Sequence, residues 1–258
     1  MEAKVTEAAE RSLDGKVALV TGAVRRIGRA IALALAGDGA AVVINTRSSR
    51  EEAEGVAAEI EAKGGRASVQ LADVTDEAAV RAMVDAALAR FGRLDILINN
   101  AADRRQAPLT EISLADWRHI TGIIVDGAFL CARACLPPMV AGGGGTVINI
   151  GGVSGHTGAH GRAHVITAKA ALVGLTKAIA VEFADRGITA NCVVPGKIGG
   201  PRSRTAGESP EMGGGAGPLV GRLGTVDEVA ALVRHLCLPQ SRYVTGQTIH
   251  ISGGMYMP

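Results

Sequence analysis

A turn near the N-terminus combines glycines with arginines in a pattern that suits a phosphate ligand. An apolar run at 17–20 enters this turn, and an alanine-rich apolar pattern with helical spacing follows it. Such a unit directs backbone N–H groups and the positive end of a helix dipole toward a dinucleotide pyrophosphate. The glycine pattern alone is weak evidence, and an ordinary turn without a ligand is the alternative. The residues concerned are Thr21, Gly22, Arg25, Arg26, Ile27 and Gly28.

The end of the second predicted strand bears on which dinucleotide fits. An acidic residue there would accept hydrogen bonds from the adenosine ribose and favour NAD(H). This chain has Asn45, Arg47 and Ser48 instead, with Arg25 and Arg26 in the neighbouring turn. Guanidinium groups match the geometry and charge of a phosphate. We therefore expect NADP(H) to be favoured over NAD(H); a solvated cluster of surface charges is the alternative.

Three histidines recur every four residues in the second half of the chain, at His156, His160 and His164. On a helix they would share one face and could hold a metal ion. Gly155, Gly158 and Gly161 in the same stretch argue against a helix, so we expect no metal site. The remaining hypotheses are that His156 or His160 supplies a proton in an active site, or that both make local hydrogen bonds in a loop.

A charged group follows the fourth predicted strand. Asp103, Arg104 and Arg105 are consecutive, directly after a stretch in which a buried strand ends. They could contact an anionic substrate, and a fully solvated position is the equal alternative.

Seven apolar segments alternate with helical patterns. This alternation predicts a single-domain, doubly wound α/β fold of the Rossmann type, with a seven-stranded parallel sheet covered by helices on both faces. We expect a flexible lead-in at 1–13, the domain at 14–258, and a mobile substrate lid or a disordered insertion at 196–224. The predicted strands are 17–21, 40–45, 67–71, 94–98, 146–150, 188–194 and 247–251, and the predicted helices are 27–36, 50–63, 76–90, 113–139, 163–185 and 226–238.

Composition excludes several classes of function. The net charge of +2, with no basic block, argues against a nucleic-acid partner. The charged N-terminus is unlike a signal peptide, and no apolar run approaches the roughly 18 residues of a membrane span. The four cysteines lie in apolar segments without a Cys-x-x-Cys pair, so we expect buried free thiols in a cytoplasmic protein.

The order of motifs resembles the short-chain dehydrogenase/reductase family, nearest to its 3-oxoacyl-[acyl-carrier-protein] reductases, over residues 13–254. The matching segments are TGAVRRIG (21–28), DV (73–74), NNAA (99–102), KAALVGLTK (169–177), NCVVPG (191–196), YVTGQ (243–247) and SGG (252–254).

The resemblance implies where a cofactor would lie. Asp73 and Val74 would line its adenine, Asn99 and Ala101 would form the central strand edge, and Lys169 would bind the nicotinamide ribose. Assembly as a tetramer or dimer is also implied, with a small-molecule substrate. The further cofactor contacts implied by the resemblance are Pro195, Gly196 and Ile198.

The catalytic positions of the family are altered in this chain. The resemblance implies an Asn, a Ser and a Tyr-x-x-x-Lys unit, in which Tyr exchanges the proton and Ser holds the substrate oxygen. Lys169 is present, but Val165 stands in place of Tyr, Gly152 in place of Ser and Ile124 in place of Asn. The two tyrosines of the chain belong to other segments. Three of the four positions therefore lack a proton-handling group.

These features predict an NADP(H)-binding protein, a divergent oxidoreductase for a small carbonyl or hydroxy substrate or an activated C=N or C=C bond. Lys169, His156 and His160 are its candidate catalytic residues. The alternatives are a catalytically inactive dinucleotide sensor or subunit, and a non-redox lyase or isomerase on the same scaffold. Fold alone does not separate them.

Overall fold

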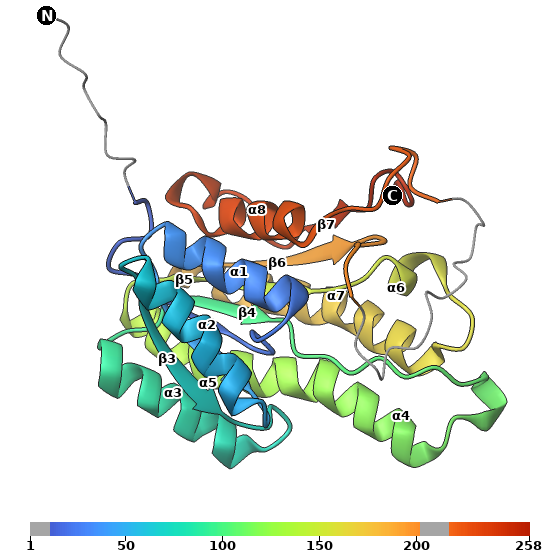
Figure 1. The fold of residues 1–258 in the computed structure, drawn as a ribbon, viewed down its shortest axis with the longest axis horizontal. Coiled ribbons are helices and arrows are strands. Elements are labelled where there is room, and N and C mark those ends of the chain that lie inside the picture. Colours follow the sequence, from blue (N-terminus) through green and yellow to red (C-terminus); the bar gives the residue numbers. More distant parts are fainter. Residues whose placement is uncertain (1–10, 202–216) are drawn as a thin grey trace, which may run out of the picture.

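The computed structural model describes residues 11–201 and 217–258. In these residues seven parallel strands form one sheet in the order β3-β2-β1-β4-β5-β6-β7 (Figure 1). The predicted seven-stranded parallel sheet is therefore confirmed. Most of the predicted lead-in at 1–13, and the centre of the predicted lid at 196–224, lie outside the described residues. The strands are β1 Val17–Val20, β2 Ala41–Thr46, β3 Arg66–Leu71, β4 Ile96–Asn99, β5 Gly145–Ile150, β6 Ile188–Pro195 and β7 Thr248–Ile251.

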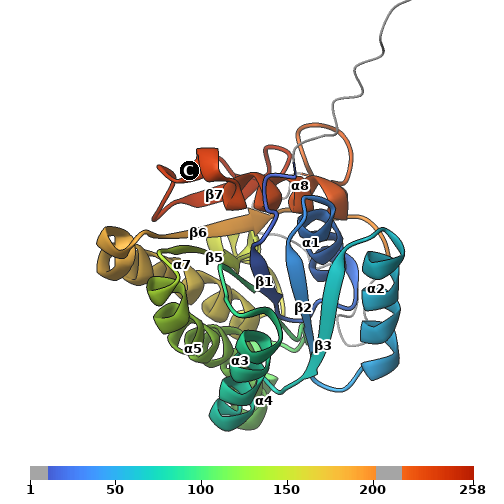
Figure 2. The ribbon, with the colours of Figure 1, turned by 90° about the vertical axis from the view of Figure 1, so that its left-hand side faces the viewer.

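Helices cover both faces of the sheet, as the sequence predicts. Figure 2 shows α1, α2 and α8 on one face and α3, α4, α5 and α7 on the other. Local signals define several ends: the Asp76 side chain caps α3, and Thr225 and Glu228 form a capping box on α8. The helices are α1 Arg26–Gly37, α2 Arg50–Ala62, α3 Glu77–Phe91, α4 Leu114–Thr121, α5 Gly127–Ala141, α6 Ser154–Thr157, α7 Ala163–Phe183 and α8 Val226–Cys237.

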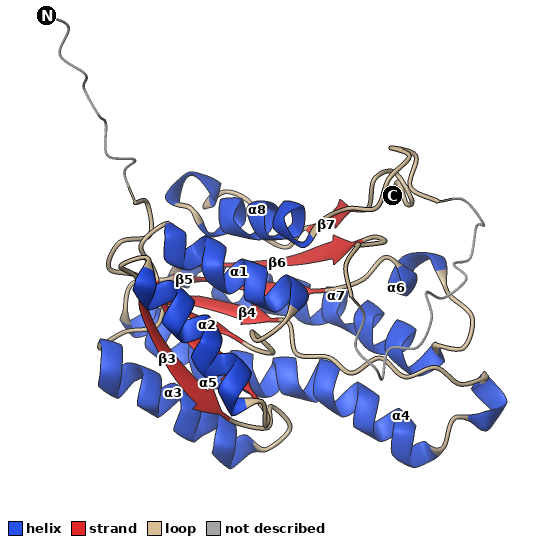
Figure 3. Cartoon of the chain, viewed as in Figure 1, coloured by secondary structure: helices blue, strands red, loops and turns tan. Residues whose placement is uncertain are grey.

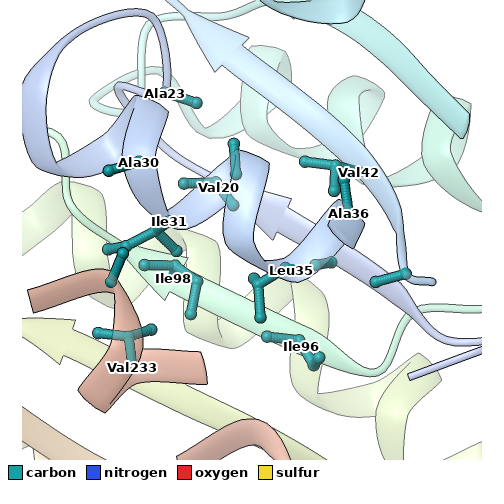
Figure 4. Close-up of a cluster of buried hydrophobic side chains, with 14 of the residues drawn as sticks. Val20, Ala23, Ala30, Ile31, Leu35, Ala36, Val42, Ile96, Ile98 and Val233 are labelled. Carbon is teal, nitrogen blue, oxygen red and sulfur yellow. The ribbon is translucent and has the colours of Figure 1, made fainter. Parts of the chain in front are cut away.

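The five central strands β2, β1, β4, β5 and β6 are buried along their whole length, which is why they read as mainly apolar runs, whereas the edge strands β3 and β7 are only partly buried. Figure 4 shows part of one core layer, where Ile31 and Leu35 of α1 pack against Ile96 and Ile98 of β4 and against Val233 of α8. All five side chains are at most 2% exposed. The four cysteines are also buried and free, as predicted.

The sheet contains a topological switch point between β1 and β4. These strands are neighbours, with Val20 beside Ile98, yet β1 leads into α1 on one face and β4 leads toward α4 on the other. Figure 3 shows the loops that follow the strands gathering at the carboxyl edge of the sheet. Open α/β sheets bind ligands in the crevice at such a point.

The long helix predicted at 113–139 is present but irregular. Helices α4 and α5 are joined by a π-helical segment, Gly122–Asp126, and Ile124 within it is buried. Wide turns of this kind are frequently found at functional sites. The spacing of apolar residues does not reveal this segment, because the extra residue in a π-helical turn changes that spacing only slightly.

Two helical segments, Leu114–Ala141 and Ala163–Arg186, are long and apolar enough to cross a membrane by length and composition alone. Helix α5 of the first segment packs on β4 and β5 and helix α7 of the second packs on β5 and β6, so 44% of the most apolar stretch of each segment is buried inside the protein. Core helices of soluble proteins pass the same test, so this is weak evidence for a membrane span.

Candidate functional site

The turn after β1 is held in place by polar groups from the end of β4. Thr21 Oγ1 donates to the carbonyl of Ile98 at 3.2 Å and accepts from the backbone N–H groups of Asn100 and Ala101 at 2.9 and 3.0 Å. The Asn100 side chain donates to the carbonyls of Thr21 and Gly22 at 2.9 and 3.0 Å. Asn100 is thus a positioning residue that the sequence analysis did not single out, although it directly follows Asn99 in the motif.

Glycine is required twice in this turn. Gly22 has a φ of 61°, in the left-handed region. A Cβ on Gly28 would lie 2.3 Å from the Gly22 carbonyl oxygen and 2.5 Å from Asn100 Nδ2. The start of α1 is therefore packed directly against the turn. This brings Thr21, Gly22 and Gly28 together as a cradle of the kind that a dinucleotide pyrophosphate needs.

The two arginines of the turn point to different partners. Arg25 forms an ion pair with Glu52 of α2, and both side chains are largely exposed. Arg26 has a φ of 48°, and its guanidinium donates to the carbonyls of Ile198 and Gly199 at 3.1 and 3.2 Å, and to that of Pro201. Arg26 thus binds the segment after β6, whereas its sequence position predicts contact with an adenosine phosphate.

The end of β2 differs in part from expectation. The amide of Asn45 is buried and donates to the carbonyls of Gln70 and Ala72 at 3.3 and 3.1 Å, so it joins β2 to β3. Arg47 and Ser48 are exposed. Of the predicted adenosine-phosphate residues in this region, only these two have side chains open to a ligand.

Asp73 and Val74 follow β3 at the same edge of the sheet. Burial raises the pKa of the Asp73 carboxyl, but hydrogen bonds from Thr75 and the nearby Arg47 charge outweigh it, so the pKa lies below its ordinary value. Asp73 Oδ1 accepts from the Thr75 backbone and hydroxyl at 2.9 and 2.7 Å. Val74 is 6% exposed. The segment is therefore rigidly placed beside the end of β2.

Asn99 belongs to a buried hydrogen-bond chain. Its Nδ2 donates to Asn149 Oδ1 at 2.9 Å, and Asn149 Nδ2 donates to Thr176 Oγ1 at 2.9 Å. The chain connects β4, β5 and α7 beneath the carboxyl edge. The side chain of Asn99 therefore contributes to the rigidity of the site.

A cavity of about 260 Å³ opens at the carboxyl ends of β5 and β6. Six predicted cofactor residues and two of the altered catalytic positions line it. The segment after β6 approaches closely here, since a Cβ on Gly196 would lie 2.7 Å from the Ser252 Cα. The predicted residues that line the cavity, besides Arg26, are Ile27, Gly152, Val165, Lys169, Pro195, Gly196 and Ile198.

Lys169 is the buried cation of this cavity. It is 4% exposed, and its Nζ donates to the carbonyl of Ile150 at 2.5 Å. Burial, with the nearby Arg104 charge, lowers the pKa of Lys169 to about 7. The ammonium therefore holds a proton that it can release near neutral pH.

Replacing Lys169 with methionine should change how stability depends on pH. Above pH 7 the unfolded chain keeps a proton, up to the ordinary lysine pKa of 10.5, that the folded chain has released. Stability of the wild type therefore rises with pH in this window, by at most about 1.4 kcal/mol per unit. Urea unfolding at pH 7, 8 and 9 should show the Lys169→Met variant losing this rise. The exposed Lys177→Met, on the same helix, is the control; parallel curves for wild type and Lys169→Met would contradict the burial argument.

None of the altered catalytic positions carries a proton donor, but they differ in how much room surrounds the side chain. A Cβ on Gly152 would meet Lys169 Cγ only at 3.8 Å, so a larger side chain fits there. Val165 and Ile124 are 3% and 2% exposed and belong to one apolar cluster. Val165 lines the cavity together with Lys169 and presents only hydrocarbon to it, whereas Ile124 does not line the cavity.

The predicted catalytic histidines do not line the cavity. The His156 ring lies 4.6 Å from that of His250 and 5.3 Å from that of Tyr256, and burial lowers the pKa of His156. His160 lines a second cavity of about 730 Å³ between the loops that precede α4 and α7. In the described parts of the chain no group of three His, Cys, Asp or Glu side chains is placed to hold a metal ion.

Comparisons with known proteins identify the family. Residues 22–256 match the family model described as enoyl-(acyl carrier protein) reductase. The chain belongs to the short-chain dehydrogenase/reductase family of oxidoreductases. The resemblance drawn from the sequence is confirmed.

Similar proteins cover nearly the whole chain. It is 40% identical over 247 residues to a 3-oxoacyl-[acyl-carrier-protein] reductase of Synechocystis, an alignment covering 95% of this chain and 99% of the relative. Identity to the enzyme of the same description from Escherichia coli is 38% over 246 residues, with 95% and 99% covered. A short-chain dehydrogenase/reductase variant from Serratia marcescens superposes with a TM-score of 0.82 at 36% identity, covering 94% of this chain and 98% of its own.

Proposed function

We propose that this family member binds NADP(H) and is a divergent oxidoreductase that works without the tyrosine acid. The observation that carries the proposal is the convergence of the β1–α1 turn, Lys169 and the segment after β6 on one cavity. The close packing at Gly28 supports a fit to the dinucleotide, because it leaves the turn's backbone N–H groups as the natural contacts. When bound, the nicotinamide supplies or accepts a hydride.

The protein's own residues would then have separate roles in binding the cofactor and in supplying a proton. The turn at Gly22 would hold the pyrophosphate, with the buried Thr21 keeping that turn in position, and Lys169 would bind the nicotinamide ribose and offer its proton inside the cavity. With valine at 165 and glycine at 152, no hydroxyl polarises the substrate oxygen. Losing a general acid costs about 10²–10⁴ in rate. The substrate is therefore one that needs little acid help, such as an activated C=C or C=N bond.

The preference for NADP(H) should depend on Arg47. Arg47 is exposed at the end of β2, whereas Arg25 is paired with Glu52 and Arg26 with backbone carbonyls. We expect Arg47→Ala to weaken NADPH binding by about tenfold or more and to leave NADH binding nearly unchanged, because only NADPH carries the additional phosphate.

The matched control for this variant is Arg50→Ala. Arg50 is exposed three residues further along and pairs with Glu54 on its own helix at 3.5 Å. Calorimetric titration of both variants with both dinucleotides checks the prediction. An equal loss for NADH and NADPH would show that Arg47 does not read the phosphate.

The experiment that tests the proposal is a titration of the purified protein with NADPH and NADH, followed by an activity screen. Micromolar binding of NADPH, weaker for NADH, supports it, and oxidation of bound NADPH by an enoyl, imine or oxo compound completes it. If the protein binds neither NADPH nor NADH, the proposal is wrong.

A second candidate is a catalytically inactive dinucleotide-binding sensor or subunit. Gly152, Val165 and Ile124 favour it, since none of them can hold or move a proton. Tight NADPH binding without oxidation by any compound of the three classes would select this candidate.

We also infer a cytoplasmic homo-oligomer, tetrameric or dimeric. Phe129 on α5 and Val181 on α7 are 46% and 83% exposed on helices with strongly apolar sequences, and such surfaces suit contact with a second copy. Sedimentation analysis of the wild type beside a Phe129→Ser, Val181→Ser variant measures this.

A further inference from the structure

Lys169 is a buried amine that no carboxylate neutralises in the described part of the chain. It is 4% exposed, and among the described residues its only hydrogen bond runs from Nζ to the carbonyl of Ile150. None of the described residues that line its cavity is an aspartate or glutamate. A buried ammonium without a carboxylate partner is costly to keep charged, so this environment favours the neutral amine.

Neighbouring titratable groups act on the charge of Lys169. Burial, with the nearby Arg104 charge, lowers the pKa of Lys169 to about 7. A thiolate at Cys192 would act in the opposite direction, but burial raises the pKa of Cys192 to about 11, so this thiol is neutral at pH 7. At pH 7 about half of the Lys169 side chains are therefore neutral amines, against less than about 0.1% of ordinary lysines. The other cations that line the cavity are Arg26, Arg162 and Lys197.

The space beside this amine is open to a small molecule. The cavity measures about 260 Å³, and Val165 presents only hydrocarbon to it. Gly152 leaves room next to the lysine stem, because a Cβ there would come no closer than 3.8 Å to Lys169 Cγ. A neutral amine that donates one N–H to the Ile150 carbonyl keeps its lone pair for a reaction. Lysines that are desolvated in an apolar pocket or lie beside another cation are activated as nucleophiles toward carbonyl carbon.

We propose that Lys169 is the nucleophile of a second, non-redox activity, in which it forms an imine with a small aldehyde or ketone. The amine nitrogen bonds to the carbonyl carbon, and the carbonyl oxygen takes a proton to become a hydroxyl. That oxygen then leaves as water with the two hydrogens of the amine, so the step needs no oxidant, reductant or further reactant. The protonated imine draws electrons from the neighbouring carbon, which is chemistry that a lyase or isomerase on this scaffold can use.

The test traps the imine on the wild-type protein in the absence of any dinucleotide. Butanal with sodium cyanoborohydride at pH 7 converts an imine into a stable secondary amine, and peptide mass spectrometry measures the rate at each lysine. Lys169 should be labelled at least about tenfold faster than Lys177, an exposed lysine on the same helix. This ratio should fall as the pH rises toward about 10, because exposed lysines then gain neutral amine, whereas Lys169 has little more to gain.

A pair of variants at Gly152 separates the effect of charge from that of access. Gly152→Asp places a carboxylate beside the ammonium and should raise the pKa of Lys169, whereas Gly152→Asn has the same shape without the charge. At pH 7 the aspartate variant should therefore be labelled at Lys169 at least about tenfold more slowly than the asparagine variant. Thermal unfolding shows whether both variants are folded.

The outcomes separate this inference from the proposed function. Labelling of Lys169 no faster than that of Lys177 in the wild type at pH 7 overturns the inference. Equal rates in the two folded Gly152 variants also overturn it, because the reaction would then not depend on the charge of Lys169. If either variant does not fold, the pH dependence of the wild-type ratio decides. No step of the test needs NADPH, so an unlabelled Lys169 leaves the proposed function standing, and a protein that binds neither dinucleotide can still form the imine.

Discussion

Gly152→Ser combined with Val165→Tyr should raise the NADPH-dependent reduction of a 3-oxoacyl thioester by about 10²-fold or more. The serine fits because a Cβ on Gly152 meets nothing closer than Lys169 Cγ at 3.8 Å. The tyrosine would stand one helical turn before Lys169, on the wall of the same cavity. Its hydroxyl would supply the proton that valine cannot.

The measurement is kcat/KM for the thioester, followed by the absorbance of NADPH. Gly152→Ser with Val165→Phe is the control, because phenylalanine brings the ring without the hydroxyl. We expect the gain with tyrosine and none with phenylalanine. Equal rates for wild type and both variants would mean that another group already donates the proton.

Gly28→Ala should lower the affinity for NADPH by about 100-fold or more. The added Cβ would stand 2.3 Å from the Gly22 carbonyl oxygen, which is backbone and cannot rotate away. The turn must therefore open, and its N–H groups leave the positions that suit a pyrophosphate.

The control lies on the same helix. A Cβ on Gly37 has nothing within 4 Å, so Gly37→Ala should leave NADPH affinity unchanged and stabilise the protein by up to about 1 kcal/mol. Calorimetry measures affinity, and thermal unfolding shows that Gly28→Ala is still folded. Near-native NADPH affinity in a folded Gly28→Ala protein would refute the assignment of the turn.

Much of the architecture is predictable from local patterns. Strands buried on both faces are mainly apolar, so the runs at 17–20 and 41–44 are recognisable as strands from the sequence. Helix ends follow from caps such as Asp76. The π-helical segment around Ile124 was missed, since the apolar pattern continues through it.

The site was predictable only where chemistry depends on backbone. Gly22 and Gly28 are needed for a turn and a close approach, which sequence spacing reveals. The roles of side chains with several possible partners could not be predicted from the sequence. Arg26 binds carbonyls after β6, Asn45 joins two strands, and His160 lines a neighbouring cavity. The ion pair of Arg25 with Glu52 was also missed, because the only sequence feature that marks Glu52 is its position as an acidic residue in the first turn of α2.

The sequence by itself determined the doubly wound sheet, the glycine turn and the absence of hydroxyl groups at 152 and 165, because each is set by residue type and short-range spacing. Only the tertiary structure decided which charges meet. Arg104 follows β4, whereas Arg162 and Lys169 lie at the start of α7, and the packing of α7 beside the carboxyl ends of β5 and β6 brings the three residues around one cavity. Electrostatic character of this kind depends on distance in space, which no local pattern encodes.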